Sequence, residues 1–82
     1  FRKIMTQIES YDAEIESLEK EFGLANEIYK TYEAKYQESL VSINDVLIKQ
    51  SYQIQKIMEL LRVKNLRNER VFALEKLINK ED

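Results

Sequence analysis

Leu40-Val41-Ser42-Ile43-Asn44-Asp45-Val46-Leu47-Ile48 is the stretch that decides the fold. It lies at the midpoint of the 82 residues, and its apolar side chains would point almost all the way round a helix. If the stretch is continuous helix, two long chains can cross at it. If it contains a turn, one chain folds back on itself. The residues on either side decide between these two folds.

A single heptad frame, with Phe1 at position a, runs through the whole chain without interruption. Its a and d positions are mostly apolar or aromatic, which predicts long helices in a left-handed coiled coil. One Gly and no Pro leave few turn-forming residues. We therefore expect an all-α fold in which residues 1–82 form a single coiled-coil segment. Because the first residue is Phe rather than Met, we expect it to belong to a larger protein.

Two places could interrupt the helix, one near residue 23 and one at residues 41–45. Gly23 lowers helix stability by about 1 kcal/mol relative to Ala, which is too little to end a helix held by a partner. Ser42 and Asp45 have the spacing of a capping box, which marks the start of many helices.

The charges divide unequally between the two halves of the chain. Residues 1–48 hold ten acidic and five basic side chains, whereas residues 49–82 hold eight basic and five acidic ones. An antiparallel arrangement about residue 41 lays the acidic half on the basic half. It also surrounds Lys64 and Arg67 with glutamates and brings Gln53 to Tyr29, whose phenol could bond the amide.

This antiparallel pairing can form between two chains or within one. A hairpin would place the six apolar side chains of residues 40–48 at its loop, and loops are usually exposed. We therefore expect an antiparallel dimer crossing at residues 40–48; the alternatives are a helical hairpin, a small helical bundle, and a parallel or heterotypic coiled coil. The candidate interface residues are Ile8, Tyr11, Ile15, Leu18, Phe22, Tyr29, Tyr32, Tyr36, Leu40, Ile43, Val46, Leu47, Gln50, Ile54, Ile57, Leu60, Leu61, Val71, Leu74 and Ile78.

Catalytic, cofactor-binding and metal-binding residues are not expected, and neither is a cofactor. The chain has no His and no Cys, and it contains no phosphate-binding glycine motif. The basic segment 62–70 belongs to a chain of net charge −2, which favours pairing with the acidic half over binding to nucleic acid. No apolar run reaches the ~18–20 residues of a transmembrane helix. We expect a non-enzymatic, cytoplasmic protein.

A glutamine layer interrupts the apolar seam of the second half. The stretch around Ile43, Val46, Gln50, Ile54, Ile57 and Leu60 is similar to the core of a Q-type SNARE motif. This resemblance covers about twenty residues, and it implies assembly with other helices in membrane trafficking. The sequence departs from the motif at Lys64 and Arg67, where further layers would be apolar, and residues 68–82 contain no apolar run of the length of a membrane anchor.

These features predict an oligomerisation or scaffolding segment that joins copies of a larger protein and sets the spacing between attached parts. The alternative is an adaptor that binds a partner helix through its apolar 40–61 surface, as in membrane trafficking or cytoskeletal assembly. The expected partner is a second copy or another helical protein.

Overall fold

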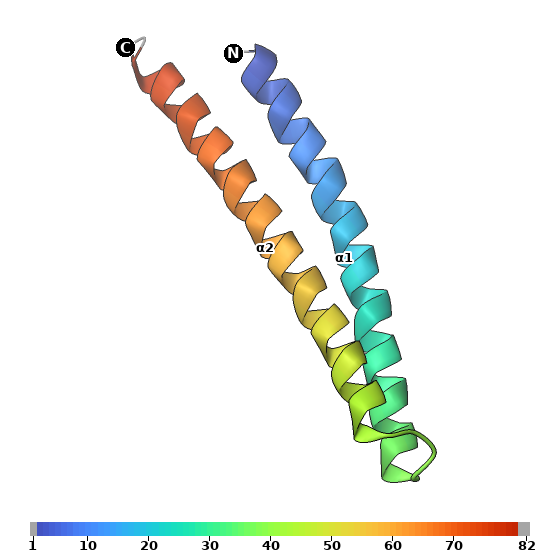
Figure 1. The fold of residues 1–82 in the computed structure, drawn as a ribbon. Coiled ribbons are helices and arrows are strands. Elements are labelled where there is room, and N and C mark those ends of the chain that lie inside the picture. Colours follow the sequence, from blue (N-terminus) through green and yellow to red (C-terminus); the bar gives the residue numbers. More distant parts are fainter. Residues whose placement is uncertain (1, 81–82) are drawn as a thin grey trace.

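Two long helices packed antiparallel make up the whole structure (Figure 1). The computed structural model describes residues 2–80; Phe1 and Glu81, which begin and end the predicted heptad frame, lie outside the described residues. Helix α1 spans Arg2–Gln37 and continues through Gly23, and helix α2 spans Ile43–Lys80. The hairpin measures 65 × 15 × 13 Å, with both ends of the chain at one end of the molecule. The all-α, antiparallel fold is confirmed, and the pairing lies within one chain.

The turn at residues 38–42 is what makes the hairpin possible. Ser39 has a φ of 61°, in the left-handed region. Its backbone N–H donates to the carbonyl of Tyr36 at 2.9 Å, and that of Leu40 donates to the carbonyl of Lys35 at 2.8 Å. These two bonds form a Schellman motif, which satisfies carbonyls that the end of a helix leaves free. A serine occupies the position where glycine is usual.

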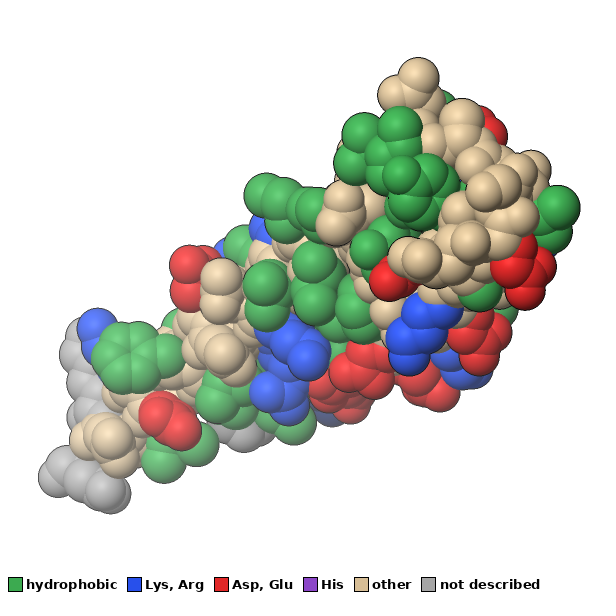
Figure 2. Space-filling view, turned by 90° about the horizontal axis from the view of Figure 1, so that it is seen from below, with side chains coloured by type: hydrophobic (Ala, Val, Ile, Leu, Met, Phe, Trp, Pro, Cys, Tyr) green, Lys and Arg blue, Asp and Glu red, His purple; other side chains and the backbone are tan. Residues whose placement is uncertain are grey.

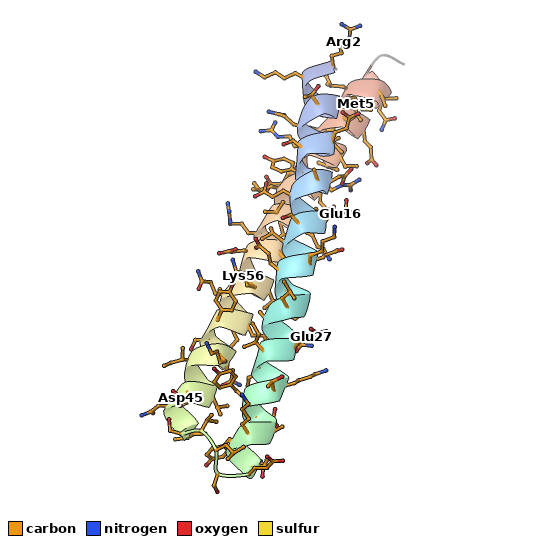
Figure 3. The ribbon with its side chains drawn as sticks, turned by 90° about the vertical axis from the view of Figure 1, so that its right-hand side faces the viewer. Arg2, Met5, Glu16, Glu27, Asp45 and Lys56 are labelled. Atoms are coloured by element: carbon orange, nitrogen blue, oxygen red, sulfur yellow. The ribbon has the colours of Figure 1, made fainter. Side chains whose placement is uncertain are left out.

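Helix α2 then begins with the capping box that the sequence contains. The Asp45 N–H donates to Ser42 Oγ, and the Ser42 N–H donates to Asp45 Oδ2, both at 3.3 Å. Figure 3 shows Asp45 in the first turn of α2. The expectation of a crossing between chains at residues 40–48 is therefore replaced by a turn. The chain can turn here because the turn takes only residues 38–42, so that residues 43–48 remain in helix α2.

The two helices use different heptad positions to face each other. In α1 the buried residues Ile8, Leu18 and Ala25 all lie at predicted a or d positions. In α2 the buried residues are Val46 and Leu60 at d, and Val63 at g. None of the a positions of α2 is buried: Gln50 and Val71 are half-buried, and the other four are exposed. The predicted frame thus holds for α1 and is rotated in α2.

The rotation of α2 has a physical reason: it changes which residues of α2 are buried against α1. It buries Val63 instead of Lys64, and Val63 packs with Leu18 and Leu60 in the core cluster that Tyr11 and Ile15 border. A lysine ammonium at that place would need a buried partner. The rotation also turns the lysines at g positions toward α1. They lie at the edge of the contact between the two helices, close to acidic and aromatic side chains.

Replacing Ser39 with Gly should stabilise the hairpin by about 1 kcal/mol, because glycine adopts the left-handed conformation without a Cβ clash. Thermal unfolding followed by circular dichroism measures the change. As a control, Ser10→Gly lies within α1 on an exposed surface, so it should destabilise by roughly 0.5–1 kcal/mol. Equal effects of the two substitutions would contradict the assigned turn.

Replacing Val63 with Ala should cost about 2 kcal/mol, because the side chain is 1% exposed and its loss removes two buried methyl groups. Leu24→Ala is the control, since Leu24 is 62% exposed and lies away from the seam. Urea unfolding of both variants gives the comparison. A loss at Val63 no larger than that at Leu24 would show that α2 is rotated differently.

Candidate interaction surface

Three ion pairs join the basic side of α2 to the acidic side of α1. Lys56 Nζ lies 3.3 Å from Glu21 Oε2, and Lys64 Nζ lies 3.7 Å from Glu19 Oε1. Arg67 donates from Nε to the carboxylate of Asp12. The predicted matching of the acidic and basic halves is confirmed. Apart from Lys56, whose side chain is largely covered, the paired side chains are partly exposed. Ion pairs at exposed positions add little stability each, so their main effect is to favour one alignment of the helices.

Polar groups near the turn end of the seam are also matched. The ammonium groups of Lys35 and Lys49 lie 5.5 and 5.0 Å from the ring centroid of Tyr32, so the ring's electrons attract both cations. The Gln53 amide donates to Asn26 Oδ1 at 2.6 Å. The expected contact of Gln53 with Tyr29 is wrong by about one helical turn, since Asn26 takes that place.

The environment of Lys56 raises the pKa of its ammonium group. Partial burial disfavours its charged form, but the hydrogen bond to Glu21 and the electrostatic attraction of Glu21, Glu59 and Tyr52 outweigh this effect. The net result is a pKa above the usual 10.5. Lys56 therefore remains a cation at neutral pH and holds its pair with α1.

The outward rotation of the a positions exposes a row of apolar side chains on α2. We call this row the outer stripe, and its residues are Ile43, Leu47, Gln50, Ile54, Ile57 and Leu61. Their spacing alternates between four and three residues, so they occupy heptad positions a and e and lie on one face of the helix. The exposed fractions of its aliphatic members run from 36% for Ile57 to 53% for Leu61. This spacing is the one by which a helix packs on another helix.

A shallow groove runs along one edge of the outer stripe. It encloses about 550 Å³ and is lined by Ser51, Ile54, Gln55, Met58, Glu59 and Arg62. Met58 is 63% exposed. Seen from the turn end, apolar side chains reach the surface along the length of the molecule, beside a separate region of clustered blue and red side chains (Figure 2). An apolar side chain of a second molecule would fit such a groove.

The twenty predicted interface residues divide by their place on the hairpin. The buried ones are Ile8, Leu18, Val46 and Leu60. The half-buried ones are Tyr11, Ile15, Phe22, Tyr29, Tyr32, Gln50, Val71 and Leu74. The exposed ones are Tyr36, Leu40, Ile43, Leu47, Ile54, Ile57, Leu61 and Ile78. Sequence reasoning thus listed the seam between α1 and α2 together with an outer face of α2. All the exposed residues stand on that face except Tyr36 of α1 and Leu40 of the turn.

Ala25, Lys56 and Val63 lie in the seam but are absent from the predicted interface residues. Ala25 stands at a predicted d position, so the heptad frame was a signal for it. Lys56 and Val63 stand at g, where Lys49 and Arg70 also lie, and nothing in that series indicates a buried position. The polar residues Lys64 and Arg67 in the predicted seam were the one sign that its second half is rotated.

Association is the chemistry that this arrangement supports. Among residues 2–80 there is no group of acidic, His or Cys side chains able to hold a metal ion. Neither of the two described helices is long and apolar enough to cross a membrane. What α2 does offer is an exposed apolar surface on a rigid helical support, a surface that suggests a protein partner.

Comparison with known proteins found no protein-family model that matches the chain, and no curated protein or solved structure that is significantly similar to it.

Replacing Glu21 with Gln should lower the free energy of unfolding at neutral pH, because Lys56 loses its charged partner on α1 and keeps only Glu59 on its own helix. A raised lysine pKa adds stability that is fully present below pH 10.5 and is lost as the pH rises through the raised value. The difference between the original protein and the variant should therefore shrink in strongly alkaline solution. Urea unfolding across this pH range measures it. Glu16→Gln, which removes only a pair with Lys20 on the same helix, should change less.

Proposed function

We propose that the chain is a non-enzymatic oligomerisation and scaffolding segment that packs the outer stripe of α2 against a helix of a second polypeptide. The observation that carries the proposal is the outer stripe itself. A helix facing one neighbour needs one apolar face, and α2 has that face against α1 and a further one exposed to solvent.

The surface area of the hairpin supports a protein partner. A monomeric globular protein of this mass exposes about 5,200 Å², whereas the hairpin exposes 6376 Å². The surplus of roughly 1,200 Å² exceeds the ~800 Å² that each partner buries in a standard interface. A second helix along the outer stripe would cover part of this surplus area.

The shape supports a role in spacing. The hairpin is 65 Å long and has both chain ends at the end opposite the turn (Figure 1). A partner bound along α2 would be held at a fixed distance and direction from whatever is attached to those ends. Because the helices are continuous over their whole lengths, the spacer is stiff.

A SNARE-like assembly receives no support from the burial pattern. Val46 and Leu60, two of the apolar layers in that resemblance, are each 6% exposed and already face α1. Other helices could reach them only if the hairpin opened. Binding along the outer stripe requires no such opening.

A photoreactive benzoylphenylalanine tests the proposed function when it replaces Ile54 in the protein expressed in cells. We expect irradiation to join it covalently to a helical segment, identified by sequencing the joined peptides. The same reagent at Ile48 is the control, because Ile48 is an equally apolar, 62% exposed residue of α2 outside the outer stripe. No adduct at Ile54, or equal adducts at both positions, would refute the proposal.

A further inference from the structure

The outer stripe of α2 is centred on residue 52 and has the properties of a self-complementary surface. We propose that its occupant is a second copy of this chain, with the two α2 helices packed antiparallel and crossing at residue 52. This inference rests on the proposed function, since it names the partner of the same surface.

The two apolar faces of α2 are separated by the angle that a helical bundle requires. The face toward α1 uses heptad positions d and g, and the outer stripe uses a and e. At 3.6 residues per turn these two faces lie about 100° apart around the helix axis. A helix with two such faces packs against two neighbours at once, as at a corner of a four-helix bundle. Helix α1 supplies one neighbour, and the stripe leaves a place for one more.

The outer stripe and its open flank carry no charge from residue 43 to residue 61. The positions concerned are a, b and e, and their residues are Ile43, Asn44, Leu47, Gln50, Ser51, Ile54, Ile57, Met58 and Leu61. The charged side chains of this part of α2 stand at positions c and g: Asp45, Lys49, Lys56 and Glu59. Of these, Glu59 also lines the groove, where its charge is paired with Lys56. A partner with a strongly charged flank would find no opposite charge there. A second copy brings the same uncharged surface, so nothing repels and no charge is left unpaired.

In antiparallel packing about residue 52, each residue of the outer stripe faces a stripe residue of the second copy. This packing places Ile43 opposite Leu61 of the second copy, and Leu47 opposite Ile57. Gln50 lies opposite Ile54, with its amide near the open flank where Ser51 meets its own counterpart. The contact extends over about 28 Å of helix, at 1.5 Å per residue. Gln50 is the one polar member, and a single polar residue in such a seam fixes the alignment of the helices.

Lys64 and Glu75 exclude the parallel alternative. They are the two charged residues at a, b or e positions of α2 within the described part of the chain. A parallel, in-register pair would put Lys64 against Lys64 and Glu75 against Glu75 inside the seam, which is unfavourable. In the antiparallel pair the contact ends near residue 61, because α2 of the second copy begins at Ile43. Both charges then remain in water.

The position of α1 is compatible with this assembly. Lys64 and Arg67 bind Glu19 and Asp12, so the outer stripe lies on the side of the hairpin where α1 carries its e positions. A two-fold axis perpendicular to the helices puts both α1 helices on the same side of the pair. The four helices then form the corners of one bundle, with the two α2 helices in direct contact and the two α1 helices farther apart.

Light scattering of the purified chain, together with two matched aspartate variants, tests the proposal. We expect a dimer that Ile54→Asp converts to a monomer, with at least a tenfold weaker association and unchanged helicity by circular dichroism. Ile48→Asp introduces the same charge at an exposed isoleucine outside the stripe, and should leave the dimer intact. A purified chain that is monomeric at hundreds of micromolar, or a dimer equally sensitive to both variants, would overturn the proposal.

The direction of packing is tested with spin labels on Ser51→Cys and, separately, on Glu69→Cys. Crossing at residue 52 predicts a short distance between the two labels at position 51 and about 50 Å between those at position 69. Similar short distances at both positions would show parallel packing and refute the proposed geometry.

Photoreaction at Ile54 separates the two proposals from each other. A monomeric purified chain that forms adducts with another protein's helix would disprove self-association and leave the proposed function standing. Absence of any stripe-specific adduct would disprove the proposed function, and the self-association with it.

Discussion

The alignment of α2 against α1, fixed by the turn at residues 38–42, is the constraint on which the rest of the structure depends. Five residues carry the chain from one helix to the other, so the turn decides how far α2 is shifted and rotated. The left-handed Ser39 and the reciprocal bonds of Ser42 and Asp45 define its path. The later contacts build on this starting point, among them the burial of Val63, while Ile57 stays exposed.

Apolar contacts and charges contribute differently to this arrangement. Leu18, Leu60 and Val63 are buried against one another, and the burial of such apolar side chains stabilises the packed helices. The pairs of Lys56 with Glu21 and of Lys64 with Glu19 are partly exposed and add little. These pairs would be broken if α2 slid along α1, so they favour one alignment out of several that the apolar residues would accept. The buried apolar residues thus accept several alignments of the two helices, and the ion pairs at the edge of the contact select one of them.

Much of this fold could be predicted from the sequence. The heptad period indicated long helices, and the charge asymmetry indicated antiparallel packing. The position of the turn was harder, because apolar residues 40–48 contain no glycine or proline. The capping box at Ser42 was the available signal, but it is short and common. Whether Ser39 adopts the left-handed backbone conformation depends on the hydrogen bonds formed once the helices have packed. No residue type in the turn indicates this conformation.

The outer surface of α2 could be predicted in part. Apolar residues at both a and e showed that this half of the chain has more than one apolar face. Which face meets α1 could not be decided, since a set including Ile57 and one including Val63 are both apolar. The choice is made by partners on the other helix, Glu21 for Lys56 and Tyr32 for Lys49. Such pairings depend on three-dimensional alignment rather than on the period of one helix.

The placement of both chain ends opposite the turn has a consequence for how the hairpin folds. Contacts close to the turn join residues near in sequence, such as Gln53 and Asn26, whereas the Arg67–Asp12 contact spans 55 positions. The entropy lost on closing a loop increases with the length of the loop. The folding order that loses the least entropy at each step is therefore to form the turn first. Each further pair of contacting residues then adds to the pair already formed. Backbone amides far from the turn would exchange with solvent sooner than those beside it, because the helix pair separates from its open end.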